Sequence, residues 1–484
     1  MSENKEEVVS EALKAEEKLR SMWYILDLEG NLVPVDEFDY TGYDNLQTFS
    51  GYEVEKDRTV DQVPPHVTLM KSLELVDYEP ASDPGNFRYY PKGRMIKALL
   101  EQYVTQEVLD YGGMDVETPI MYNMKHPTLE KYLHRFPARQ YTIEHDDDRY
   151  FLRFAACFGQ FLMAHDATIS YRDLPLRIYE LTRYSFRREQ RGELVGLRRL
   201  RSFTMPDVHA MCRDLPQAKK EFRRRLKLVV DTLTGIGFEK DEFELGLRMT
   251  EDFYRKNKRF VQSIVRGHGK PALVEMWKER FFYFILKYEL NFIDALGKAS
   301  ALATDQIDVE NGERYDITFM DEEGHENHPL ILHCSPSGAI ERDIYALLEK
   351  AHMGMAKDVR PSLPLWLAPT QVRLIPVNED HVALAEGYAK KLTRAKVRAD
   401  FDDRTETVQK KIRDAEKEWI PYIVVLGDRE VGAETVPVRV REDGKLHQMS
   451  LSELSSLIKK QVRGKPYRPL PMPMGVQGRP KFVG

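Results

Sequence analysis

The sequence predicts an α+β domain followed by a smaller α/β domain, and three observations favour this fold class. Over residues 86–360, segments that alternate in residue character, as antiparallel strands do, are interspersed with helical segments. A proline-rich linker at 361–370 then interrupts the chain, and strands and helices alternate one by one over 371–465. The total of 484 residues is too long for one ordinary domain and fits two or three.

Composition and charge predict a cytoplasmic protein that does not enter a membrane. The 72 Lys and Arg residues nearly balance the 78 Asp and Glu residues, so any contact with RNA must come from a local patch. No apolar run approaches the roughly 18 residues of a membrane span. The first residues also lack the features of a signal peptide. The three cysteines form no CxxC pair and no framework typical of a disulfide-rich protein.

The first elements are predicted from breaks and from apolar spacing. Residues 1–85 form a short N-terminal extension, with an acidic helix over 1–20 and short mixed segments over 22–85 that are irregular or form a small β-rich part. The α+β domain opens with a helix over 92–111, whose apolar residues recur at helical spacing until a Gly-Gly pair stops it. A strand at 114–121 follows.

The centre of the α+β domain is predicted as a strand pair followed by a helical region. Segments 174–188 and 198–209 alternate in residue character as two paired antiparallel strands. Residues 216–265 have a helical and strongly basic pattern, which is typical of a solvated helix face. The remaining elements of this domain are strands at 281–292, 305–309, 315–320 and 330–334, and a helix at 338–350.

The α/β domain over 371–465 shows regular alternation of short elements. Its strands are predicted at 371–377, 396–401, 422–426 and 436–440, and its helices at 379–394, 405–419 and 450–461. The tail over 466–484 is rich in Pro and Gly, and we expect it to be mobile.

The segment 183–209 crowds arginines onto both arms of a predicted hairpin. Arginine presents a fixed planar fork that keeps its charge near neutral pH, so it suits the phosphates of ATP. Arg187 and Arg199 lie on opposite arms, Glu189 can accept a hydrogen bond from an adenine amino group, and Phe203 can stack on the base. Because an arginine-rich hairpin is about as often a surface or RNA contact, the ATP interpretation requires further motifs.

Three segments in sequence order resemble the motifs of class II aminoacyl-tRNA synthetases. The helix that ends at a Gly-Gly pair and the strand at 114–121 resemble motif 1, residues 183–209 resemble motif 2, and Gly-Ala-Ile-Glu-Arg at 338–342 resembles motif 3. The resemblance implies an antiparallel sheet with flanking helices, a homodimer across motif 1, and ATP bound with Mg²⁺. Arg187 would then stabilise charge on the α-phosphate, and Arg342 would contact the γ-phosphate.

A second set of segments is similar to threonyl-tRNA synthetases over about residues 86–462. The segments are Arg-Phe-Ala-Ala-Cys at 153–157, Phe-Thr-Met-Pro-Asp-Val-His at 203–209 and His-Cys-Ser-Pro-Ser-Gly at 333–338. Taken singly, each Cys or His in them is more often a buried thiol or a core histidine. The family resemblance implies that one zinc ion is held by Cys157, His209 and His333.

Zinc would serve recognition in such a site. Threonine and valine are nearly isosteric, and an apolar pocket separates such pairs by only about a hundredfold. A zinc ion with an open position can bind the amino group and the hydroxyl of threonine, which valine lacks. The resemblance further implies that Asp207 and Gln306 bind threonine, and that the threonyl-adenylate made from threonine and ATP passes its threonyl group to threonine tRNA.

The C-terminal domain resembles the anticodon-binding module that several class II synthetases share. Single-stranded bases are read through their exposed edges by polar side chains. Glu430 and Arg439 match positions that contact anticodon bases in threonyl enzymes, and Arg404 is a weaker candidate. The alternative for each residue is a charged strand edge that keeps the protein soluble.

Two features depart from the threonyl-tRNA synthetase pattern. Only about 85 residues precede motif 1, with one His and no Cys, so we expect no editing in cis and a separate protein that edits in trans, as in some archaea. Phe284 stands where bacterial enzymes use a tyrosine near the substrate, and either Tyr283 or Tyr288 compensates.

Two alternative functions remain open at the level of sequence. One is another class IIa synthetase, such as a prolyl enzyme, which the Cys and two His of the implied zinc site argue against. The other is a catalytically inactive, synthetase-like regulator that binds tRNA. The intact ATP-binding set argues against that alternative.

Overall fold

The computed structural model describes residues 21–55, 62–133, 140–189 and 191–483. The chain divides into two compact units, one formed by residues up to 61 and 104–343, the other by residues 62–103 and 344–484. The helix predicted over 1–20 lies outside the described residues. Within the described ranges, no helix has both the length and the apolar character needed to cross a membrane.

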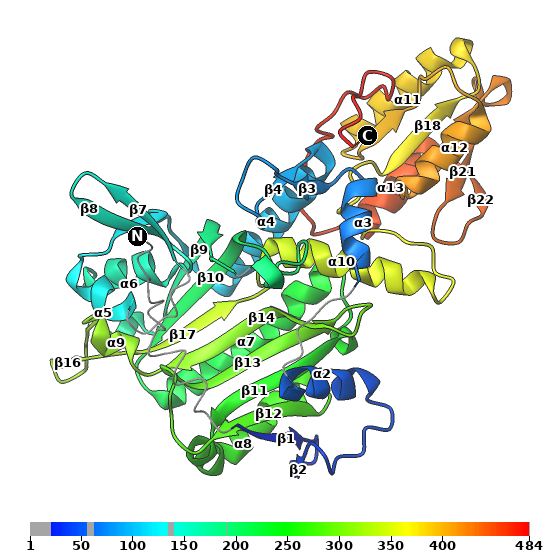
Figure 1. Cartoon of the computed structure of the whole chain (residues 1–484). Coiled ribbons are helices and arrows are strands. Elements are labelled where there is room, and N and C mark those ends of the chain that lie inside the picture. Colours follow the sequence, from blue (N-terminus) through cyan, green and yellow to red (C-terminus); the bar gives the residue numbers. More distant parts are fainter. Residues whose placement is uncertain (1–20, 56–61, 134–139, 190, 484) are drawn as a thin grey trace, which may run out of the picture. The chain divides into compact units, whose positions relative to one another are not determined.

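A ten-stranded sheet organises the first unit (Figure 1). Its spatial order is β2-β1-β12-β11-β13-β14-β17-β10-β9-β5. All neighbours whose pairing is defined run antiparallel except β11 with β12 and β5 with β9, which run parallel. The bounds are β1 Met22–Leu26, β2 Leu32–Pro34, β5 Met114–Asp115, β9 Leu176–Phe186, β10 Ser202–Cys212, β11 Phe243–Thr250, β12 Ala272–Trp277, β13 Phe284–Ile293, β14 Ala299–Asp308 and β17 Leu330–Ser335. The predicted antiparallel α+β class is therefore confirmed.

Pairing across this sheet aligns residues that are far apart in sequence. One row on β11, β13, β14, β17 and β10 consists of Arg248, Lys287, Gln306, His333 and His209. The adjacent row on the same strands consists of Leu247, Tyr288, Asp305, Cys334 and Val208. Successive residues of a strand point to opposite faces, so the first row lies on one face, here called the front, and the second row on the back.

Helices cover both faces of the sheet. On the front, α2 (Asp44–Glu55) lies over β11, β12 and β13 and pairs its Glu53 with Arg248 at 2.8 Å (Figure 1). On the back, α7 (Leu215–Ile236) contacts β10, β14 and β17, and Phe222 packs edge-on against Tyr288 at 5.1 Å. Helix α8 (Glu251–His268) contacts β11 and β12. The candidate site lies on the front face of β10, β14 and β17, where His209, Gln306 and His333 are aligned.

The helical region predicted over 216–265 is only partly correct. Strand β11 separates α7 from α8, because Phe243, Leu245, Leu247 and Met249 alternate with less apolar residues and are buried with period two. The basic run is not uniformly solvated either, since Arg225 in its middle is fully buried.

Further differences concern short strands of the first unit. The strand predicted at 114–121 is split into β5 and β6 (Met121–Asn123), and Pro119 lies between them. The strand predicted at 315–320 shrinks to β15 (Phe319–Met320), preceded by α9 (Asn311–Arg314) and paired with β16 (Glu326–Asn327). The prediction also missed β12, and it anticipated a small β-rich extension over 22–85 without placing β1 and β2 in it.

A small subdomain within the first unit carries the cysteine of the implied zinc site. Its three strands are ordered β6-β8-β7, with β7 at Tyr141–His145 and β8 at Asp148–Leu152. Helices α5 (Pro127–Leu133) and α6 (Cys157–His165) complete it. Its aromatic core includes Phe151, Phe158 and Phe161, each fully buried. This core fixes the first turn of α6, where Cys157 lies.

The second unit contains the C-terminal α/β domain, a five-stranded sheet of order β19-β18-β20-β21-β22. The strands are β18 Val372–Pro376, β19 Ala399–Phe401, β20 Tyr422–Leu426, β21 Val436–Val440 and β22 Leu446–Met449, and the helices are α11 Val382–Arg394, α12 Val408–Lys417 and α13 Leu451–Gln461. Strands β18, β19 and β20 are parallel, while β21 and β22 are antiparallel. Every strand and helix predicted here is present, and only β22 was missed.

Other elements of the second unit precede that sheet in the sequence. They are α3 Pro65–Ser72, β3 Val76–Tyr78 and β4 Phe87–Tyr89. Two helices run across the boundary between the units, namely α4 Pro91–Tyr111 and α10 Ile340–Met355. The described part of the tail contacts the rest of this unit: Arg479 pairs with Asp400 at 2.8 Å, and Phe482 stacks on Tyr90 at 5.2 Å.

Candidate active site

The arginine-rich hairpin is formed by β9 and β10, which pair antiparallel from Phe186 with Ser202 onwards. The register shifts between Phe203 and Met205, so two residues of β9 oppose Thr204. The backbone N–H of Thr204 donates instead to Oε2 of Glu341 at 2.9 Å. The motif 2 strand and the beginning of the motif 3 helix are thereby joined by a buried contact.

The structure brings three of the predicted ATP-binding residues together. Glu189 is buried, and its carboxylate lies 3.2 Å from Arg199 and 3.6 Å from Arg187, whose side chain is half exposed. Arg201 donates to the carbonyl oxygen of Glu189 at 2.8 Å from Nε. Glu189 therefore holds both arginines at the same place, where a bound triphosphate would compete for them.

Arg342 is fixed to the same region from the other side. Its Nε donates to the carbonyl oxygen of Arg198 and its Nη1 to that of Ala301, both at 3.0 Å. Arg198 belongs to the segment that leads into β10, next to Arg199. The fifth residue predicted to bind ATP, Phe203, is the second residue of β10.

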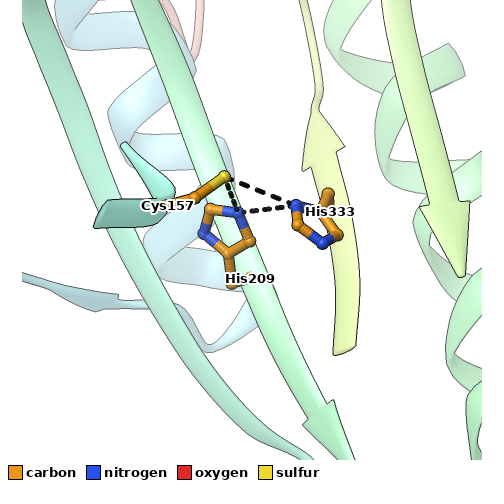
Figure 2. A group of neighbouring side chains, drawn as sticks. All are labelled: Cys157, His209 and His333. Carbon is orange, nitrogen blue, oxygen red and sulfur yellow. Dashed lines mark hydrogen bonds between the residues drawn. The ribbon is translucent and has the colours of Figure 1, made fainter. Parts of the chain in front are cut away.

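Cys157, His209 and His333 converge from α6, β10 and β17 (Figure 2). Cys157 Sγ lies 3.3 Å from Nε2 of His209 and 3.5 Å from Nδ1 of His333. The same two nitrogens are 3.1 Å apart. One sulfur and two imidazole nitrogens thus face one point, which is the donor set of a catalytic-type zinc site with a fourth position open.

The other nitrogen of each imidazole has a partner of its own. Nδ1 of His209 lies 2.7 Å from Oε1 of Gln160, and Nε2 of His333 lies 2.7 Å from Oδ2 of Asp308. An oxygen acceptor at one ring nitrogen keeps the proton there and leaves the second nitrogen with its lone pair. The imidazoles are therefore oriented as metal ligands require.

Burial and aromatic packing fix the same two rings. Phe161 packs edge-on against His209 at 4.9 Å and against His333 at 5.5 Å between ring centres. Burial, with His333 and Arg225 nearby, holds the pKa of His209 well below its usual value, so its imidazole is neutral. A neutral imidazole is the form that binds a metal ion. The donor set fits a zinc ion in its chemistry, and His209 has the neutral form that binds one.

The other two cysteines lie on the back of the same strands. Burial raises the pKa of Cys212 to about 12 and raises that of Cys334 further. Both are therefore neutral thiols at physiological pH, whereas a metal ligand must be a thiolate.

Asp207 and Gln306, the residues predicted to bind threonine, adjoin the cluster on the front face. Asp207 lies two residues before His209 on β10 and accepts a hydrogen bond from Thr182 Oγ1 at 3.3 Å. Burial raises the pKa of Asp207 to about 7, although the hydrogen bond from Thr182 opposes this rise. Gln306 pairs with His333 across β14 and β17.

The sequence left open whether Tyr283 or Tyr288 compensates for Phe284, and Tyr283 is the one that lies at this site. Its hydroxyl accepts a hydrogen bond from Nε2 of Gln306 at 2.8 Å, and its ring lies 5.5 Å from that of His333. Phe284 is buried against Phe282 at 5.0 Å, and Tyr288 is buried on the back face. Of the three candidates, Tyr283 alone contacts the cluster.

Sequence reasoning missed Gln160 and Asp308. A signal was present for each, because Gln160 follows Cys157 by three residues on one helix face and Asp308 follows Gln306 by two residues on one strand face. Neither position could be linked to a particular histidine from spacing alone.

The residues predicted to read the anticodon lie on separate segments of the C-terminal domain. Glu430 accepts a hydrogen bond from the backbone N–H of Gly427 at 2.9 Å, which fixes its turn. Arg439 lies on β21 with a partly exposed side chain, 4.0 Å from Glu416. The weaker candidate, Arg404, is held by Asp402 at 2.6 Å.

Comparison with known proteins agrees with this organisation. A model described as tRNA synthetase class II core domain (G, H, P, S and T) matches residues 141–351, and a model described as anticodon binding domain matches residues 371–461. A crystal structure described as the RNA binding domain of threonyl-tRNA synthetase from Cryptosporidium parvum shares the fold, with a TM-score of 0.71 at 23% identity over 83% of this chain and 99% of that chain. A prolyl-tRNA synthetase from the same organism has a TM-score of 0.63 at 18% identity, over 83% of this chain and 79% of that chain.

Curated relatives are far more similar in sequence. Threonine–tRNA ligase from Pyrococcus horikoshii is 60% identical over 99% of this chain and 77% of its own length. The corresponding ligase from Methanosarcina barkeri is 57% identical over 99% of this chain and 76% of its own length. With identity of this level along nearly its whole length, and with both family domains in place, the chain belongs to the threonine–tRNA ligase family of class II synthetases.

Proposed function

We propose that this chain joins threonine to the 3′ end of threonine tRNA through a threonyl-adenylate made from threonine and ATP with Mg²⁺. The observation that carries the proposal is the convergence of Cys157, His209 and His333 beside Asp207 and Gln306. The arginine-rich hairpin and the first residues of the motif 3 helix, which include Arg342 and would hold ATP, lie in the same unit as this cluster.

The first step needs positioning and electrostatics rather than an enzyme nucleophile. The threonine carboxylate attacks the α-phosphate, and pyrophosphate leaves. Arg187 and Arg199 are already gathered by Glu189, so little reorganisation is required when they turn to a triphosphate. Arg342, held by two backbone carbonyls, presents a guanidinium of fixed direction to the terminal phosphate.

Cys157, His209 and His333 would hold a zinc ion in this proposal. When bound, zinc would supply coordination left open by its three protein ligands, and expansion to five-coordinate would let it take both the amino group and the hydroxyl of one amino acid. Asp207 orients the ammonium group from its place beside His209. Gln306, steadied by Tyr283, lines the pocket beside the substrate side chain. Valine leaves these polar groups without a partner, which disfavours its binding.

A homodimer across motif 1 is part of the proposal. Strand β5 lies at the edge of the ten-stranded sheet and is only two residues long. Four large apolar side chains in the segment 109–121, which includes β5, are exposed, namely Leu109, Met114, Ile120 and Met121. Exposed apolar groups gathered at a sheet edge are typical of a protein interface.

Glu430 and Arg439 are proposed to contact anticodon bases. Both lie within the match to the anticodon binding domain, and Arg439 offers donors from a strand surface. Glu430 is fixed by its bond to Gly427, so its position costs little to order on binding.

The 484-residue chain is further proposed to charge tRNA without hydrolysing seryl-tRNA, leaving that task to a separate protein. His66 is the sole histidine among residues 1–85, which contain no cysteine. Its ring is fully buried and bonded to Glu349 at 2.7 Å, so it is not placed to activate a water molecule. Mixing purified chain with serine, ATP and threonine tRNA should accumulate seryl-tRNA, and rapid hydrolysis would contradict this part of the proposal.

Amino-acid-dependent exchange of pyrophosphate into ATP tests the main proposal. All twenty amino acids are compared, and threonine should support exchange at the highest rate, with serine second and valine far lower. Proline-dependent exchange would favour a prolyl-type enzyme instead. The absence of exchange with every amino acid would contradict the proposed reaction.

A further inference from the structure

A buried arginine lies directly behind the candidate metal site. Arg225 projects from α7 to the back of the sheet and has no exposed surface. Its Nη2 donates to the carbonyl oxygen of Val208 at 2.9 Å and its Nη1 to that of Leu332 at 3.1 Å. Its Nε lies 3.2 Å from a carboxylate oxygen of Asp305. One side chain therefore contacts three neighbouring strands, β10, β17 and β14.

Each partner of Arg225 immediately precedes a residue of the front face. The pairs are Val208 with His209, Leu332 with His333, and Asp305 with Gln306. Because successive strand residues point to opposite faces, a displacement of any of these backbone segments also moves the side chain on the front. The positions of the two histidines and the glutamine therefore all depend on the contacts of Arg225 behind the sheet.

Stability alone does not explain an arginine in this place. The cost of removing two charges from water offsets much of their attraction, and apolar side chains of similar volume often replace a buried ion pair without loss of stability. The distinctive property of arginine is its rigid planar fork, which fixes the directions of several N–H donors at once. The two carbonyls, on β17 and β10, accept from the two Nη groups of this fork, and the Asp305 carboxylate on β14 forms an ion pair with its Nε side.

We propose that Arg225 is a positioning residue of the metal site. It sets the spacing between the strands that carry His209 and His333, and it holds the strand of Gln306 in the same frame. The proposal rests on the proposed function, since it presupposes that the two histidines and Cys157 bind a metal ion. Arg225 acts through the backbone and does not touch the substrate.

Metal sites are sensitive to such support. Ligands must be held within about 0.5 Å of the working geometry. Loss of a contact that orients a ligand typically costs roughly 10–100-fold in metal affinity. A change in the spacing of these strands should therefore lower the metal affinity and alter the spectrum of the bound ion before it affects other properties.

The test compares variants of the full chain. Arg225→Met combined with Asp305→Leu removes both buried charges together, so no uncompensated charge is left in the core. Arg225→Lys keeps the charge but loses the fork. Each protein is loaded with Co²⁺, its visible absorption spectrum is recorded, and the Co²⁺ dissociation constant is measured by competition with a chelator. Thermal unfolding is followed in parallel.

We expect the double variant to unfold cooperatively, to bind Co²⁺ at least tenfold more weakly than the wild type, and to show an altered spectrum. The Co²⁺ affinity of Arg225→Lys should lie between that of the wild type and that of the double variant. Arg398→Met is the matched control, because Arg398 is also buried and donates to the carbonyls of Ala368 and Trp366, but in the other unit. It should lower the unfolding temperature and leave the Co²⁺ spectrum unchanged.

A folded double variant with the wild-type spectrum and affinity would overturn the proposal. If that variant does not fold, Arg225→Lys provides the test instead. Co²⁺ binding by Arg225→Lys with the wild-type spectrum and affinity would then overturn the proposal. Failure of the proposed function looks different, because the wild type itself would then bind no Co²⁺, or would bind it equally well after Cys157→Ser.

Discussion

Asp308 controls which nitrogen of His333 carries the proton, and Asp308→Asn should reverse that choice. Oδ1 of Asp308 accepts the backbone N–H groups of Glu310 at 2.8 Å and Asn311 at 3.0 Å. Oδ2 faces Nε2 of His333 at 2.7 Å and accepts from Nδ2 of Asn311 at 2.5 Å. In the asparagine variant the two backbone donors, which cannot turn, retain the amide oxygen, so the amide NH₂ faces His333 and the side chain of Asn311 has to turn its own amide oxygen toward it.

The amide NH₂ can bond to Nε2 of His333 only if that nitrogen has no proton. The proton then moves to Nδ1, the nitrogen that faces Cys157 and His209. A protonated Nδ1 cannot bind a metal ion. The change of tautomer together with the loss of the charged acceptor should weaken metal binding by at least the roughly 10–100-fold typical of such partners, which is about 1.4–2.8 kcal/mol.

The assay is competition between the protein and a chromophoric chelator for zinc, with threonine-dependent pyrophosphate exchange measured on the same preparations. Asp321→Asn is the matched control, since Asp321 also accepts backbone N–H groups in a turn but contacts no candidate ligand. Equal zinc affinity in Asp308→Asn and the wild type would refute the reasoning on the tautomer.

Four further predictions follow from single contacts. Arg342→Ala should abolish pyrophosphate exchange and retain tRNA binding, measured by filter retention; exchange at the wild-type rate would remove Arg342 from the ATP site. Gln306→Ala should reduce the preference for threonine over valine by roughly tenfold or more in the same exchange assay, and an unchanged ratio would argue against its role. Arg439→Ala should weaken tRNA binding and, if it contacts phosphate, lower the salt slope by about 1; unaltered binding would exclude it from the interface. Burial would raise the pKa of Glu289, yet Arg248 lowers it to about 2, below the unfolded value of about 4.3. Ionised Glu289 therefore contributes its full stability at pH values above its unfolded-state pKa, and this contribution is lost as the pH falls toward 2. The difference in unfolding free energy between the wild type and Glu289→Gln should shrink over that pH range; a constant difference would contradict the lowered pKa of Glu289.

The fold was predictable where local pattern and burial agree. In the C-terminal domain every predicted strand and helix is present, because short apolar strands alternate there with amphipathic helices that have clear ends. Strand β11 was missed although Thr250 caps the next helix, where its Oγ1 accepts a hydrogen bond from the backbone N–H of Phe253. The charged, helix-like segments on both sides concealed an alternation of only eight residues. Pairing of β1 with β12 joins residues about 250 positions apart, which no local pattern can reveal.

The candidate site was likewise predictable only in part from the sequence. Cys157, His209 and His333 were selected by resemblance to a family, and the structure brings them within hydrogen-bonding distance of one another. Their supports were not predictable in this way. Arg225 looked like one cation among many on a basic helix, and its burial follows from the position of α7 across three strands.

The central claim is that Cys157, His209 and His333 bind one zinc ion that serves the recognition of threonine. Zinc content per chain, with X-ray absorption at the zinc edge to identify its ligands, tests this most directly. We expect one zinc per wild-type chain with one sulfur and two imidazole nitrogens among its ligands, and loss of the metal and of the preference for threonine over valine in Cys157→Ser. A metal-free wild type that still selects threonine over valine would contradict it.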